Sequence, residues 1–233
     1  MLFGLFSGDW TILIVLPAFI FTLWAQVSVQ SAYQKYSRVR NAYGMTGADA
    51  ARRILNQNGL HHIRIEMIPG EMTDHYDPRA GVIRLSEGVY HTASVAAVGI
   101  AAHEAGHAVQ HATKYGALKI RNAIIPVCRF GSIAAMPLFF IGLLLVSDVL
   151  MTVGILAYSV VTLFQLITLP VEFNASRRAI KAIEGWGYMS NDESRGSRKV
   201  LRAAAMTYVA ALATSLLTLL RLLLILSGNR DRR

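Results

Sequence analysis

The sequence predicts a mainly α-helical integral membrane protein, with about four transmembrane helices and a polar region that contains a short β-strand. Hydrophobic residues make up 54% of the chain, and its mean hydropathy is +0.41. Several apolar runs reach the roughly 20 residues that a helix needs to cross the hydrocarbon core of a bilayer. The single cysteine, Cys128, excludes an intramolecular disulfide framework.

Four apolar segments account for this composition, and each is expected to cross the membrane as a helix. They are residues 10–29, 124–146, 149–169 and 203–226. No small-residue cleavage site follows the first segment, so we interpret it as an anchor and not as a removable signal peptide. Only Ser147-Asp148 separates the second and third segments, which predicts a tight hairpin.

Basic residues are concentrated in two connecting stretches, and the positive-inside rule therefore places residues 30–120 and 171–202 on the cytoplasmic side. These lysines and arginines are Lys35, Arg38, Arg40, Arg52, Arg53, Arg177, Arg178, Lys181, Arg195, Arg198, Lys199 and Arg202. Loops that face anionic lipid explain the net charge of +9, and no interleaving of basic and aromatic residues indicates nucleic-acid binding.

Two arginine features fit this topology less well. Four crossings would leave Arg230, Arg232 and Arg233 on the outer side, against the positive-inside rule. Arg221 lies inside the last apolar segment, where we expect it to snorkel or to face the helix bundle.

The stretch His103-Glu104-Ala105-Gly106-His107 carries the most specific chemical signal. Residues i and i+4 share one face of a helix, so both imidazoles can converge on one zinc ion while Glu104 lies near its open position. In peptidases with this pattern the glutamate is the general base. We expect the motif on a packed helix that Ser94 could cap. The alternative is a pair of core histidines with an incidental glutamate.

A zinc peptidase needs a third protein ligand, and Glu172 is the expected one. It follows the third apolar segment on the same side of the membrane, and Pro170 is expected to separate that crossing from a new helical turn. Ser176 would share a face with Glu172 and could orient a zinc histidine, as in gluzincins. The alternative for Glu172 is an ion pair with Arg177 or Arg178.

Other classes of zinc peptidase fit the sequence less well. His111 lies another turn along the helix, about 6 Å further, so we expect it near the site or at the surface and not on the metal. A metzincin would need glycine and histidine where the chain has Gln110 and Thr113. An intramembrane site-2 protease would carry the motif inside a crossing, whereas this segment is short and has polar flanks.

Three segments outside the motif have recognisable local patterns. Residues 46–59 predict an amphipathic helix that ends at Gly59. Residues 81–85 predict a short strand, whose edge could pair with an extended substrate or which could simply pack on the motif helix. Residues 74–78 are polar and turn-like, which predicts a loop, and a functional interpretation would place His75 or Tyr76 beside a developing oxyanion.

Several stretches, in order along the chain, resemble the YugP-like family of neutral zinc metallopeptidases of bacterial membranes. They are Thr46-Gly47 with residues 51–55, and residues 73–78, 85–90, 101–110 and 169–176. The resemblance implies a membrane-anchored metallopeptidase, distantly similar to the HtpX-type gluzincins, with His103, His107 and Glu172 as zinc ligands. Gluzincins of that type usually carry aspartate where this chain has Ser176.

We therefore expect residues 1–233 to form one membrane-embedded metallopeptidase domain with a cytoplasmic gluzincin-like core. It would be a multi-pass protein of the cell membrane that uses Zn²⁺, with Glu104 activating water to hydrolyse protein or peptide substrates, which could include membrane proteins. The alternative is a non-catalytic zinc-binding scaffold or a degenerate peptidase that binds partners. The intact Glu104 argues against degeneration.

Overall fold

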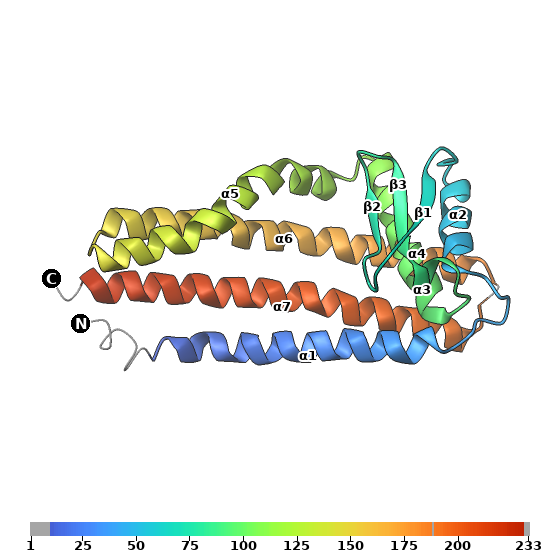
Figure 1. The fold of residues 1–233 in the computed structure, drawn as a ribbon, viewed down its shortest axis with the longest axis horizontal. Coiled ribbons are helices and arrows are strands. Elements are labelled where there is room, and N and C mark those ends of the chain that lie inside the picture. The colour runs from blue at the N-terminus through green and yellow to red at the C-terminus, as the bar shows by residue number, and fades with distance from the viewer. Residues whose placement is uncertain (1–9, 188, 231–233) are drawn as a thin grey trace. The chain divides into compact units, whose positions relative to one another are not determined.

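The computed structural model describes residues 10–187 and 189–230, which form seven helices and a small three-stranded sheet (Figure 1). The elements are α1 (Ile12–Ser37), α2 (Gly47–Gln57), β1 (Arg64–Ile68), β2 (His75–Asp77), β3 (Val82–Ser86), α3 (Glu87–Tyr90), α4 (Val95–Ala112), α5 (Gly116–Leu144), α6 (Asp148–Gly185) and α7 (Asn191–Arg230). This confirms the predicted fold class. Arg232 and Arg233, named in the topology argument, lie outside the described residues.

Four of these helices, α1, α5, α6 and α7, are long and apolar enough to cross a membrane, as the sequence predicts. The predicted break at Pro170 is wrong, because α6 continues through this proline. Proline costs a helix one backbone hydrogen bond, but its fixed φ is compatible with helical geometry. The residues that follow offset this loss by packing, since Val171, Ala175 and Ala179 recur at helical spacing and are fully buried.

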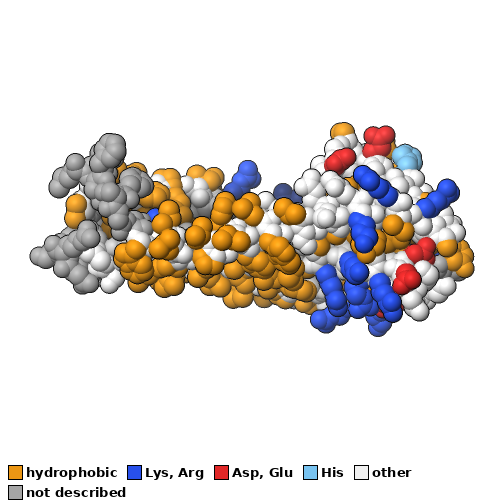
Figure 2. All heavy atoms as spheres, turned by 90° about the horizontal axis from the view of Figure 1, so that it is seen from below, with side chains coloured by type: hydrophobic (Ala, Val, Ile, Leu, Met, Phe, Trp, Pro, Cys, Tyr) orange, Lys and Arg blue, Asp and Glu red, His pale blue; other side chains and the backbone are white. Residues whose placement is uncertain are grey.

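The chain divides into two compact units. The first comprises residues 1–24, 120–169 and 207–233, and hydrophobic side chains cover much of the face of its helices visible in Figure 2. Its own buried cluster centres on Phe139, Met151 and Leu222. Within this unit Arg221 donates a hydrogen bond from Nε to Thr11 Oγ1 at 3.2 Å, so the arginine has a polar contact inside the helix bundle.

The second unit comprises residues 25–119 and 170–206 and contains the sheet, with strand order β1-β3-β2. β3 confirms the strand predicted at residues 81–85. It is the central strand, because β1 pairs with it in parallel and β2 pairs with it in antiparallel fashion. The hypothesis that this strand offers an edge to substrate is therefore wrong, since both of its edges are already occupied.

β2 replaces the loop that the sequence predicts at residues 74–78. His75, Tyr76 and Asp77 pair with Arg84, Ile83 and Val82. The polar residues act at the two ends of this strand. Asp77 accepts hydrogen bonds from the backbone of Arg79 and Ala80, which turns the chain into β3, and Asp74 accepts from the backbone and hydroxyl of Ser86.

α2 confirms the predicted amphipathic helix. Thr46 and Asp49 form a capping box, in which the Thr46 hydroxyl accepts from the Asp49 backbone and the Asp49 carboxylate accepts from the Thr46 backbone. Its buried face consists of Ala50, Ala51, Ile54 and Leu55. This face belongs to the core of the second unit, together with β3 and α4, and Figure 1 shows α2 and the sheet beside α4.

α4 is the central helix of this core. Ser94 caps it, as predicted, by accepting a hydrogen bond from the backbone N–H of Ala97 at 3.1 Å. Its small buried residues allow other helices to approach closely. A Cβ atom on Gly106 would lie 2.7 Å from the backbone oxygen of Ala175 in α6, and one on Gly99 would lie 3.2 Å from the side chain of Ser197 in α7.

We predict that Gly106→Ala destabilises the protein and that Gly99→Ala is much better tolerated. Alanine gains about 1 kcal/mol of helix propensity over glycine at both positions. At Gly106 the new methyl group would clash with rigid backbone, and overpacking of this kind costs about 1–3 kcal/mol. Thermal unfolding of the detergent-purified proteins should show a Tm several degrees lower for Gly106→Ala only. Equal Tm values for Gly106→Ala and Gly99→Ala would mean that α4 and α6 can move apart at Gly106 without loss of stability.

Candidate metal centre

Three metal-binding side chains converge inside the second unit. α4 presents His103 and His107 on one face, with their Nε2 atoms 3.1 Å apart. α6 brings Glu172, whose Oε2 lies 3.3 Å from His103 Nε2 and 3.4 Å from His107 Nε2. The glutamate side chain is only 4% exposed and the histidines 15% and 13%, so the three atoms meet where little water reaches them.

The spacing of these atoms fits a tetrahedral ion. Ligand atoms about 2.0–2.1 Å from a tetrahedral zinc ion lie roughly 3.3–3.4 Å from one another. The three observed distances, 3.1, 3.3 and 3.4 Å, are close to this value. Two imidazole nitrogens and one carboxylate oxygen are also the ligands of a known class of catalytic zinc sites. These residues could therefore hold a metal ion.

Each histidine has a second hydrogen-bond partner at its Nδ1 atom. Ser176 Oγ lies 3.1 Å from Nδ1 of His103, and Gln110 Oε1 lies 3.0 Å from Nδ1 of His107. The serine contact agrees with the position expected from the sequence, one turn beyond Glu172. Such contacts hold the ring planes and leave the Nε2 atoms directed at the shared position.

The sequence did not indicate a role for Gln110 at the site. This residue was considered as a mismatch to the metzincin pattern. Its side chain is completely buried, and Nε2 donates to the backbone oxygen of Val171 at 2.8 Å and to Asn174 Oδ1 at 3.0 Å. Asn174 also accepts a hydrogen bond from Arg178 Nε at 2.9 Å. The only signal in the sequence was that Gln110 follows His107 by three residues and so shares its helix face.

Glu104 is buried beside the histidine pair, with a relative exposure of 9%. Burial raises the pKa of its carboxyl group above the ordinary value for glutamate. The two histidines oppose this rise in pKa, whereas the carboxylates of Glu172 and Asp74 add to it. The site thus contains two buried glutamates. Glu172 contacts both imidazoles, whereas Glu104 lies beside the histidine pair.

The structure brings two of the other candidates, Tyr76 and His111, into contact with each other, whereas the third, His75, has different partners. Tyr76 packs against the core of the second unit, and its hydroxyl lies 3.1 Å from Nδ1 of the exposed His111, one turn beyond His107 on α4. His75 is exposed on the other face of β2, where it contacts Thr73 and Arg84. Of the two β2 side chains, only Tyr76 is therefore brought to the motif helix.

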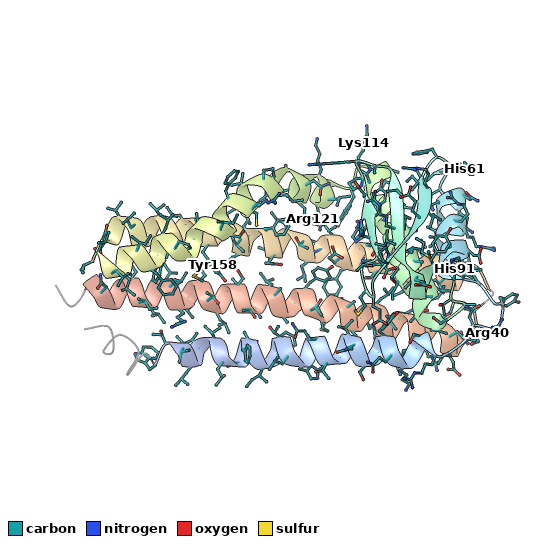
Figure 3. All side chains as sticks on the ribbon, in the orientation of Figure 1. Arg40, His61, His91, Lys114, Arg121 and Tyr158 are labelled. Carbon is teal, nitrogen blue, oxygen red and sulfur yellow. The ribbon has the colours of Figure 1, made fainter. Side chains whose placement is uncertain are left out.

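Two other histidines of this unit, His61 and His91, have local partners. His61 lies near the end of α2, and His91 lies next to α3 (Figure 3). His61 contacts the Asn56 side chain at 3.1 Å, and His91 packs edge-on against Tyr90. Neither belongs to the group of three ligand atoms described above.

Comparison with known proteins agrees with this geometry. The family model described as "Putative neutral zinc metallopeptidase" matches residues 11–227. The chain is 49% identical over 220 residues to the protein named "Putative membrane protease YugP" of Bacillus subtilis (strain 168), a match that covers 94% of this chain and 98% of that protein. No solved structure matches the chain. The resemblance inferred from the sequence is thus confirmed, and the chain belongs to the "Putative neutral zinc metallopeptidase" family.

Proposed function

We propose that this protein is a membrane-anchored zinc endopeptidase, with His103, His107 and Glu172 as its metal ligands. The observation that carries the proposal is the convergence of two Nε2 atoms and one carboxylate oxygen at mutual distances of 3.1–3.4 Å. Membership of a zinc metallopeptidase family and the four candidate membrane spans support it.

Glu104 is the proposed general base. Zinc in such a site supplies a Lewis acid that polarises a peptide carbonyl and lowers the pKa of water. Glu104 would take the proton of the attacking water and deliver it to the leaving amine.

The number of ligands favours catalysis over a purely structural zinc site. Structural zinc is usually bound by four protein side chains, whereas a catalytic site has three and leaves one position for water or substrate. The group that converges in the described part of the chain has three members, His103, His107 and Glu172.

We assign Tyr76, and not His75, to contact with the substrate. Tyr76 reaches the motif helix through its hydrogen bond with His111, whereas His75 is on the opposite face of β2. A phenol hydroxyl beside a reacting carbonyl can donate a hydrogen bond to the developing oxyanion.

The proposed location of the site is the cytoplasmic face of the cell membrane, where protein or peptide substrates would reach it. The two stretches that form the second unit carry most of the basic residues of the chain, which the positive-inside rule places in the cytoplasm.

We expect Glu104→Gln to lose cleavage of an unstructured reporter protein while it keeps bound zinc. Loss of a general base costs about 10²- to 10⁴-fold in rate, and the amide leaves the three ligands unchanged. Proteolysis and metal content should be measured together on detergent-purified proteins, with His103→Ala as the variant expected to lose both. Equal cleavage by wild type and Glu104→Gln would contradict the role of Glu104, and a wild type that binds no zinc would contradict the metallopeptidase proposal.

The proposed orientation predicts which positions react with a membrane-impermeant maleimide. Because Cys128 is the sole cysteine, Cys128→Ser gives a background free of thiols. Glu71→Cys, at an exposed position of the second unit, should stay unlabelled in intact cells and react in inside-out vesicles. Ser147→Cys, between α5 and α6, is the matched control and should show the reverse pattern. Labelling of Glu71→Cys in intact cells would place the site on the outer side.

A further inference from the structure

Gln110 is a fully buried polar side chain that connects the two helices carrying the candidate ligands. Its carbonyl oxygen lies 3.0 Å from His107 Nδ1 on α4. Its amide nitrogen donates to two acceptors on α6, the backbone oxygen of Val171 and the side-chain oxygen of Asn174. Both N–H groups of the amide are thus used, and the oxygen is directed at an imidazole.

These partners fix the orientation of the amide. The backbone oxygen of Val171 can only accept, so the Gln110 atom 2.8 Å from it must be the nitrogen. The remaining atom is then the oxygen, which also can only accept. It follows that His107 carries a proton on Nδ1, which leaves Nε2 as the nitrogen available to a metal ion. This tautomer is the one that a metal bound at Nε2 requires.

His103 provides the contrast. Its Nδ1 partner is the hydroxyl of Ser176, which can either donate or accept a hydrogen bond. The serine can hold the ring in place without deciding which nitrogen is protonated. Only His107 therefore has its tautomer set by an obligate acceptor.

The same side chain also fixes the helix that carries Glu172. Val171 directly precedes Glu172, and Asn174 lies two residues after it. Hydrogen bonds to both determine the rotation of α6 about its own axis beside α4. Asn174 is held in turn by Arg178, one turn further along the helix.

We propose that Gln110 is a positioning residue of the zinc site. Its contact with His107 holds that ring in the metal-binding tautomer, whereas its contacts with α6 stabilise the fold around the site. This inference rests on the proposed zinc site and adds a residue to it. A purely structural role is the rival explanation, because a buried amide with three hydrogen bonds also stabilises a fold. The two explanations differ in whether zinc affinity depends on the contact with His107 itself.

Two substitutions at this position separate the contacts. Gln110→Met keeps the length of the side chain and removes all of its hydrogen bonds. Gln110→Glu presents a carboxylate that accepts from His107 Nδ1 but faces the backbone oxygen of Val171 without a donor. The first variant therefore loses all three hydrogen bonds, whereas the second keeps the one to His107 and loses the donation to both acceptors on α6. Gln57→Met is the control for loss of a glutamine hydrogen bond elsewhere in the same unit, since the exposed Gln57 accepts from Trp186 Nε1, which is not one of the candidate ligands.

The experiment measures zinc affinity by competition with a chelator, and Tm of the zinc-free protein, for wild type and the three variants. We expect Gln110→Met to bind zinc about 10- to 100-fold more weakly, the usual effect of losing a partner of a metal-bound histidine. Gln110→Glu should stay within a few fold of wild type in affinity, although its zinc-free Tm falls at least as far as that of Gln110→Met. Gln57→Met should change Tm alone.

If zinc affinity falls in both Gln110 variants, in proportion to the fall in the Tm of the zinc-free protein, the inference is overturned in favour of a structural role. Unchanged affinity in Gln110→Met would overturn it as well, while leaving the zinc site intact. A wild-type protein that binds no zinc would instead overturn the proposed function, and with it the role of Gln110.

Discussion

The close approach of α4 and α6 at Gly106 is the constraint on which the candidate site depends. The absence of a side chain at Gly106 lets the Ala175 backbone lie against α4. At this separation Glu172 can reach both imidazoles, Ser176 can reach His103, and Gln110 can reach Val171. A wider separation would stretch all of these contacts at once, because they are arranged along one line of contact between two rigid helices.

The site concentrates polarity within an otherwise apolar core. α4 buries mainly alanine, valine and glycine around its histidine pair. Buried polar groups are costly unless they are hydrogen-bonded, and Gln110 meets this demand with three partners. The two Nε2 atoms and the carboxylate oxygen of Glu172 are different, because three such atoms within 3.4 Å of one another repel unless a proton or a cation lies among them. The second unit is thus organised to attract a positive charge at one point.

The sequence predicted those features that local patterns determine. The spacing of apolar residues indicated α2, segment length identified the four long helices, and the spacing of His103 and His107 indicated one face of a helix. Features that depend on distant partners were missed or mispredicted. α6 passes through Pro170 because the following residues pack in the core. Gln110 on α4 donates hydrogen bonds to Val171 and Asn174 on α6. β2 was mispredicted for a different reason. Its partner β3 is close in the sequence, but the polar residues of β2 resemble a loop.

The path of the chain between the ligands has a consequence for biogenesis. His103 and His107 are followed by α5 and the apolar half of α6 before Glu172 occurs, and these two helices are candidate membrane spans. A chain that has been synthesised only as far as α4 contains the whole H-E-x-x-H motif but lacks its third ligand. The complete set of candidate ligands therefore exists only after the α5–α6 hairpin has been synthesised, so a metal ion can be bound by all three side chains only from that point on.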